Sequence, residues 1–164
     1  MSNKPILAVL IVISALNLAL TTWLVIDSNR PNQLSGAKQT SPLPAELSAS
    51  KRDAIFEQVK NLYNTQDYDG LYAIFAREVQ VQIPKDQFIA SMDKLRATFS
   101  DIEDGAYSYY EFVGNRGGRA FYNLYYTVRL SKSAISPKGS LKITVVVVEG
   151  NVAVYGIYLN SITQ

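Results

Sequence analysis

The chain has 164 residues, a formal net charge of +2, and neither cysteine nor histidine. The missing thiol excludes disulfides, cysteine catalysis, thiolate metal sites and a lipid-modified cysteine anchor, and the missing imidazole removes the commonest general base and metal ligand. The part beyond residue 47 is close to neutral, which argues against a nucleic-acid partner.

The first predicted element is an apolar run over residues 5–26 that contains no charged side chain. A helix of about 22 residues spans about 33 Å, enough to cross the hydrocarbon core of a bilayer. Lys4 and the α-amino group precede the run, so the positive-inside rule keeps residues 1–4 as a cytoplasmic stub. We therefore expect a single-pass signal-anchor that crosses the lipid bilayer of the inner (plasma) membrane at 5–26. The C-terminal domain then lies on the extracytoplasmic, periplasmic side.

A cleaved signal peptide is the alternative reading of this run. Its cleavage site would lie near Ala19-Leu20-Thr21, the nearest approach to the small-residue pattern that signal peptidase needs. Cleavage there would leave an apolar segment around Trp23 at the mature N-terminus, which favours the uncleaved anchor.

A flexible linker is predicted at residues 27–47, because Pro, Ser, Asn, Gln and Thr dominate this segment. One domain follows at 48–164, a length typical of a single hydrophobic core. Three helices open it, with apolar residues at helical spacing. Their stripes are Ile55, Phe56, Val59, Leu62 and Tyr63, then Tyr68, Leu71, Tyr72 and Phe75, then Phe88, Met92, Leu95, Phe99 and Ile102.

Two further signals divide these helices. Val79, Val81 and Ile83 alternate with polar residues, which predicts a short extra strand. Pro84 then opens the third helix, since its fixed φ suits the first turn of a helix.

From Gly105 the apolar period changes to two, and four strands are predicted at about 106–114, 118–131, 140–149 and 152–162. Helices followed by a meander of antiparallel strands indicate an α+β domain, with the helices packed on one face of the sheet. In the second strand, the side that includes Tyr122, Leu124 and Tyr126 is expected to face the helices.

The other face of the sheet also carries apolar residues, since 141–148 is apolar on both sides of the strand. We therefore expect something to cover Val146 and Val148, and a second copy of the domain would do so as a homodimer. Asn17, with Ala15 and Ala19 four residues apart, could also bring two membrane helices together.

The order of elements resembles the cone-shaped fold of the nuclear transport factor 2-like superfamily, and in particular small secreted or membrane-anchored bacterial members of undefined function. The likeness rests on the Asp-Tyr-x-Gly-Leu-Tyr-x-x-Phe segment at 67–75 and on a helix from Pro84 to Phe99 that runs into Gly105. It covers the chain from about residue 50 to the end. The resemblance implies either an enzyme of the isomerase or dehydratase kind or a non-catalytic binding or assembly domain.

Tyrosines are the candidate ligand-binding residues, because they are abundant and all lie beyond residue 60. Five are expected on one inner face around a small apolar ligand: Tyr72, Tyr110, Tyr122, Tyr126 and Tyr155. Buried hydroxyls need partners, and a wet or ligand-filled cavity would supply them. The alternative is a sheet with an ordinary amphipathic face.

Catalysis lacks a recognisable base. The resembled enzymes place Asp, His or Tyr inside the cone, whereas the strand carboxylates here are Glu111, predicted to point outward, and Glu149 at a turn. Asp101, Glu103 and Asp104 form an acidic group, but it lacks the spacing of a calcium-binding loop and is typical of a solvated helix end. We therefore predict no metal and no cofactor.

These features predict a membrane-anchored, extracytoplasmic, non-catalytic binding domain for a protein partner or a small apolar ligand. The alternatives are an envelope assembly scaffold that acts through dimerisation, and an isomerase- or dehydratase-like enzyme that uses tyrosine and Glu111.

Overall fold

The structure is a computed structural model that describes residues 43–131 and 136–162. A 3₁₀ turn and four helices precede four strands. In chain order these are η1 (Ala45–Leu47), α2 (Ala49–Asn64), α3 (Tyr68–Ala73), α4 (Arg77–Gln82), α5 (Lys85–Phe99), β1 (Ile102–Arg116), β2 (Arg119–Leu130), β3 (Lys138–Val148) and β4 (Asn151–Ser161). The predicted α+β class is confirmed.

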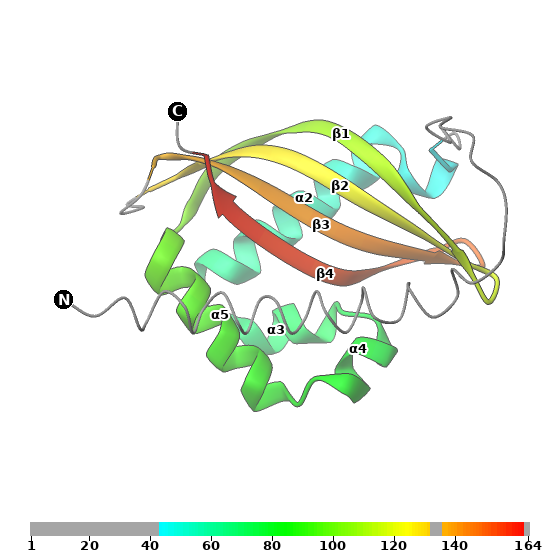
Figure 1. Cartoon of the computed structure of the whole chain (residues 1–164), viewed down its shortest axis with the longest axis horizontal. Coiled ribbons are helices and arrows are strands. Elements are labelled where there is room, and N and C mark those ends of the chain that lie inside the picture. Colours follow the sequence, from blue (N-terminus) through cyan, green and yellow to red (C-terminus); the bar gives the residue numbers. More distant parts are fainter. Residues whose placement is uncertain (1–42, 132–135, 163–164) are drawn as a thin grey trace, which may run out of the picture. The chain divides into compact units, whose positions relative to one another are not determined.

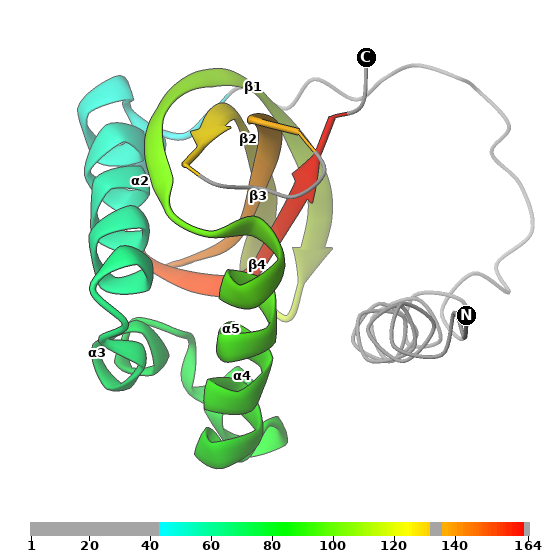
Figure 2. The same ribbon diagram turned by 90° about the vertical axis from the view of Figure 1, so that its left-hand side faces the viewer.

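The strands form one antiparallel sheet in the order β1-β2-β3-β4, so the predicted meander is also confirmed. The described helices lie on one side of this sheet, which we call its inner face. Helix α2 packs against this face, and α3, α4 and α5 lie near the edge formed by β4 (Figures 1 and 2). The opposite side of the sheet is called the outer face below.

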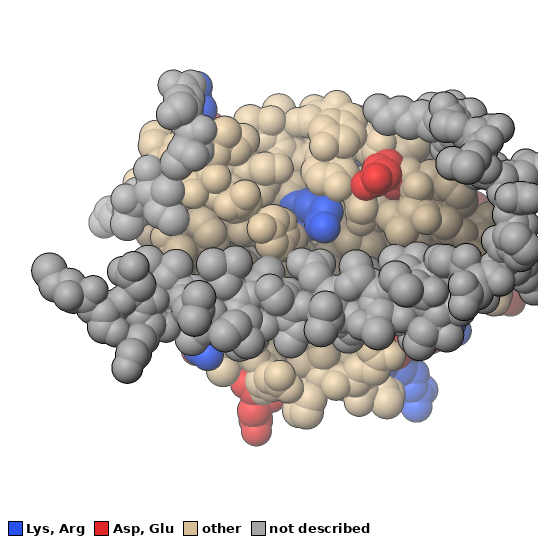
Figure 3. Space-filling view, in the orientation of Figure 1, with Lys and Arg blue, Asp and Glu red and all other residues tan. Residues whose placement is uncertain are grey.

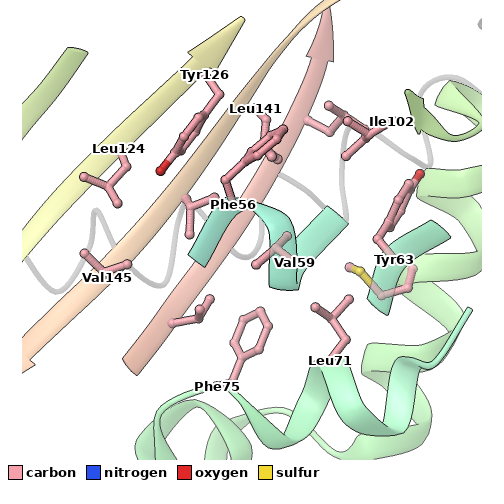
Figure 4. Close-up of a cluster of buried hydrophobic side chains, with 14 of the residues drawn as sticks. Phe56, Val59, Tyr63, Leu71, Phe75, Ile102, Leu124, Tyr126, Leu141 and Val145 are labelled. Atoms are coloured by element: carbon pink, nitrogen blue, oxygen red, sulfur yellow. The ribbon is translucent and has the colours of Figure 1, made fainter. Parts of the chain in front are cut away.

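The core lies between α2 and the inner face of the sheet. Tyr122, Leu124, Tyr126, Val128 and Leu130 of β2 are all buried, as the alternation predicted. Their cross-strand neighbours on β3 are buried as well, and Figure 4 shows the side chains of α2 and α3 reaching toward them. Burial of this apolar surface is the main stabilising contribution to the fold.

The predicted extra strand around residues 79–83 is wrong, because this segment forms helix α4. In a helix, Val79 and Ile83 are four residues apart and share one face, whereas Val81 points away and is 78% exposed. Two of the three alternating apolar residues also fit a helical period. The burial of Val79 and the hydrogen bonds between Gln80 and Tyr72 of α3 hold the segment as a helix. The described part of the domain therefore has four α-helices before the sheet, where three were predicted.

The compact unit begins before the predicted boundary at residue 48. Leu47 is fully buried in the core and Leu43 packs against it, so the end of the predicted linker belongs to the domain. Two isolated leucines in a polar stretch give no periodic signal, which explains the difference. The predicted stub at 1–4, the anchor at 5–26 and the linker up to residue 42 lie outside the described residues.

Among the helices that the structure does describe, none has the length and apolar character needed to cross a bilayer. The segment at 5–26, for which an anchor is predicted, is not among them.

Candidate functional site

Two of the five predicted tyrosines are part of the core. Tyr122 is 5% exposed and Tyr126 2% exposed, both on the inner face of β2. The Tyr126 ring stacks on Phe56 of α2 with 4.8 Å between centroids, and its hydroxyl donates a 2.9 Å hydrogen bond to the carbonyl oxygen of Arg52. The need of the Tyr126 hydroxyl for a partner is therefore met by the fold itself.

Tyr110 lies beside this pair, together with Tyr107, which the sequence did not single out. Tyr110 is 6.4 Å from Tyr122 and Tyr107 is 5.8 Å from Tyr126, measured between ring centroids. The Arg52 guanidinium lies 3.9 Å from the Tyr107 ring centroid in a cation–π contact. Burial raises the pKa of Tyr107, and the Arg52 charge opposes that shift.

A β-bulge explains why Tyr107 was missed. Tyr107 and Tyr110 are three residues apart, so strict alternation places them on opposite faces. The β1–β2 register shifts between Tyr107 and Tyr109, because Ser108 is an extra residue on β1 without a register partner on β2. This bulge places the rings of Tyr107 and Tyr110 on the same, inner face. No local sequence signal marks that bulge.

Tyr72 has a structural role at a different place. Its hydroxyl lies 2.7 Å from the carbonyl oxygen of Gln80 and 2.8 Å from that of Ile83, and it links α3 to the end of α4. The Gln80 side chain returns the contact by donating to the carbonyl oxygens of Tyr72 and Phe75, at 3.0 and 2.9 Å. The Tyr72 ring packs on Phe88.

Tyr155 is not on the inner face, which corrects the prediction. The register shifts between Thr144 and Val145, which pair with Gly156 and Val154, so Tyr155 is the additional residue on β4. Its ring packs edge-on against Phe121, the outer-face neighbour of Tyr122, with 5.1 Å between centroids. The five predicted tyrosines thus lie in three separate environments.

The outer face carries a row of side chains that crosses all four strands. Tyr109, Tyr125, Lys142 and Tyr158 are successive cross-strand neighbours, and we call them the aromatic row. The Tyr109 and Tyr125 rings stack 4.4 Å apart, and the Lys142 ammonium lies 5.4 Å from the Tyr158 ring centroid. Tyr109 is 56% and Tyr158 36% exposed, so large aromatic surface faces outward.

A second row of outer-face residues is polar and lies directly beside the first. Glu111 accepts hydrogen bonds from the Asn123 amide at 3.0 Å and from the Tyr125 hydroxyl at 3.1 Å, and Asn123 in turn accepts one from Thr144 at 2.8 Å. Burial and the neighbouring Glu111 carboxylate raise the pKa of Tyr125 to about 12. These polar groups are paired within the sheet, and Glu111 points outward as predicted.

Beyond the polar row, on the side away from the Arg129 ion pairs, the outer face becomes apolar. A third row contains Phe121, Val146 and Ala153 as cross-strand neighbours, and Val146 is buried between them. Figure 3 shows a broad uncharged surface over the middle of this side, with a blue and a red group within it and further charged side chains along the lower edge.

The acidic group after α5 is engaged in ion pairs. Asp101 pairs with Arg96, and Glu103 and Asp104 both pair with Arg129, at 2.8 and 2.6 Å. Within residues 43–131 and 136–162, no group of three or more possible His, Cys, Asp or Glu ligands is placed to hold a metal ion.

The chain matches no protein-family model, no curated protein and no solved structure. The fold and the two faces of its sheet are therefore the basis for inferring a function.

Proposed function

We propose that the chain is a membrane-anchored, extracytoplasmic binding protein that holds a protein partner on the outer face of its sheet. The observation that carries this proposal is the aromatic row, with Tyr109 and Tyr158 exposed at its two ends. The anchor at 5–26 and its orientation rest on the apolar run and on Lys4, and membership of the cone-fold superfamily rests on the resemblance described above.

The composition of the outer face supports a protein partner. Tyrosine is enriched and charged residues are depleted at the centres of protein interfaces, and Tyr is among the residues that dominate binding energy there. The central charged residues of this face are already paired, Glu111 with Asn123 and Tyr125, and Lys142 with the Tyr158 ring. A partner that covers this face would therefore leave few uncompensated polar groups.

The inner tyrosines support a small apolar ligand less well. Tyr122 and Tyr126 fill the core, and Tyr155 is on the other face. An isomerase- or dehydratase-like activity has less support still, because Glu111 belongs to the outer polar row and not to the tyrosines around Tyr126. The binding role is thus proposed as non-catalytic.

Site-specific photo-crosslinking in intact cells tests the proposal. A photoreactive amino acid at position 109 should capture one protein of constant mass, whereas the same group at Val81, 78% exposed on α4, should not. The captured protein is then purified, and its affinity should fall at least tenfold with Tyr109→Ala combined with Tyr158→Ala, and remain unchanged with Val81→Ala.

Two outcomes would contradict a heterologous partner. A crosslinked product of twice the chain's own mass would identify a homodimer on this face, the scaffold alternative. Equal labelling at positions 109 and 81, or an affinity insensitive to the tyrosine substitutions, would remove the outer face as the binding site.

A further inference from the structure

A buried polar cluster lies at a junction of four elements. Here the end of α2, the start of α3 and the end of α5 meet the first residues of β1. Tyr63 and Tyr68 are 2% and 6% exposed, and neither hydroxyl has a hydrogen-bond partner among the described residues. Figure 4 shows the Tyr63 ring extending beyond Val59 and Leu71 on the side of Ile102. Two buried hydroxyls without partners are costly for a fold and require an explanation.

Charged groups surround the two hydroxyls. Arg96 of α5 pairs with Asp101, and its guanidinium also donates to the carbonyl oxygen of Tyr63 at 3.3 Å. The Oδ1 atom of Asp101 is buried and has no hydrogen bond of good geometry besides this ion pair. Burial raises the pKa of both tyrosines. The Asp93 carboxylate raises the pKa of Tyr68 further, although it forms no hydrogen bond of good geometry with the Tyr68 hydroxyl.

The backbone around this cluster is in an uncommon conformation. Gln66, between α2 and α3, and Ser100, between α5 and β1, both have φ of +59°. Left-handed conformations are unfavourable for residues with a side chain and persist where surrounding contacts hold them. Two of the three non-glycine residues with positive φ among the described residues therefore flank the same junction.

From this arrangement we infer that the junction is a binding site for one ordered water molecule, which bridges the hydroxyls of Tyr63 and Tyr68 to the Asp101 carboxylate. A buried water typically makes about three hydrogen bonds. The two unpartnered hydroxyls supply two of them here, and the Asp101 carboxylate, which also pairs with Arg96, supplies the third. An anion does not suit the site, because the carboxylates of Asp93 and Asp101 outnumber the Arg96 guanidinium. Water both donates to the carboxylate and accepts from the tyrosines.

The bridge would join segments that are far apart in the sequence. Tyr63 and Tyr68 belong to the first helices, and Asp101 leads into the first strand, so the water would tie the helical layer to the beginning of the sheet. This site is separate from the outer face and does not depend on the proposed binding function.

A double-mutant cycle tests the inference in the folded domain. If a shared water satisfies both hydroxyls, Tyr63→Phe and Tyr68→Phe should each raise the unfolding equilibrium constant about three- to tenfold. The double variant should then fall short of the product of the two effects, because both act through one molecule. Tyr72→Phe is the matched control, since its hydroxyl bonds directly to backbone carbonyls and should combine multiplicatively with either change.

A high-resolution crystal structure gives the second measurement. Density for a water within about 3.2 Å of both hydroxyl oxygens and of Asp101 would support the site. The inference is overturned if the Tyr68 hydroxyl instead bonds Asp93 directly, if the density belongs to a larger molecule, or if the single Tyr→Phe changes are neutral or stabilising.

Discussion

Asn64, the last residue of α2, exchanges two hydrogen bonds with the backbone of Ile102, the first residue of β1. The Asn64 side-chain amide donates to the Ile102 carbonyl oxygen at 2.7 Å and its oxygen accepts from the Ile102 N–H at 2.9 Å. The side chain thus acts as a neighbouring strand would, and it satisfies backbone groups of a residue that is 1% exposed.

Replacing this amide should destabilise the domain. Asn64→Asp keeps the shape but loses the donor and places a carboxylate near the Ile102 carbonyl, so we expect the free energy of unfolding to fall by about 1–3 kcal/mol. Urea unfolding followed by circular dichroism measures the change. The exposed Asn61→Asp on the same helix is the control, and equal effects at the two positions would contradict the role of Asn64.

Gly105 permits α2 to approach β1 closely. A Cβ at this position would lie 2.5 Å from Cζ of Phe56 and 2.9 Å from Cγ1 of Val128, both in the core. Gly105→Ala should therefore lower the free energy of unfolding by about 1–3 kcal/mol through overpacking, although Gly→Ala is stabilising where there is room.

Two comparisons separate overpacking from a general effect of the substitution. In Gly156→Ala the added Cβ would be 3.7 Å from Thr144, an ordinary contact, so this variant should change stability little. Shortening Phe56 to Leu should make Gly105→Ala less harmful than in the wild-type background. Additive losses in the double variant would show that the contact with Phe56 is not the cause.

Tyr72→Phe should loosen α4 while the sheet remains intact. The change removes the hydroxyl that contacts the carbonyl oxygens of Gln80 and Ile83, at a loss of about 1 kcal/mol. Hydrogen exchange should be faster for the amides of Val79 and Gln80, and unchanged for the central amides of β2 and β3. The exposed Tyr158→Phe serves as control, and uniform acceleration across the domain would argue against a local link.

The stability of the domain should fall in alkaline solution. Tyr125 has its pKa raised from 10.0 to about 12, so between these values it stays protonated in the fold while it ionises in the unfolded chain. The folded state then binds more protons, and the free energy of unfolding decreases as the pH rises. The contribution of Tyr125 to stability is therefore complete below pH 10 and is lost as the pH rises through about 12.

Tyrosinate absorbance and urea midpoints between pH 9 and 12 would measure this effect. Glu111→Gln should lower the pKa of Tyr125, because the neighbouring carboxylate is one cause of its elevation. Superimposable titration curves for Glu111→Gln and the wild type would show that the pair does not interact in solution.

The class of the domain and the order of the strands could be predicted from sequence because they rest on local patterns. The period of the apolar residues around Phe56 and Phe88 marks α2 and α5, and the alternation along 122–130 assigns the faces of β2. Such patterns persist because every residue of an element shares one geometry. Short or irregular segments lack that redundancy, which is why α4 was predicted as a strand and Leu47 as part of a linker.

The placement of the tyrosines was decided only by tertiary structure. A one-residue register shift moves every later side chain to the other face of a sheet, and the shifts near Ser108 and Tyr155 are set by pairing with β2 and β3. The aromatic row, the link from Asn64 to Ile102 and the buried cluster at Tyr63 join residues that are distant in the chain. The sequence by itself determined which segments are apolar and at what period, whereas long-range pairing decided which polar atoms meet.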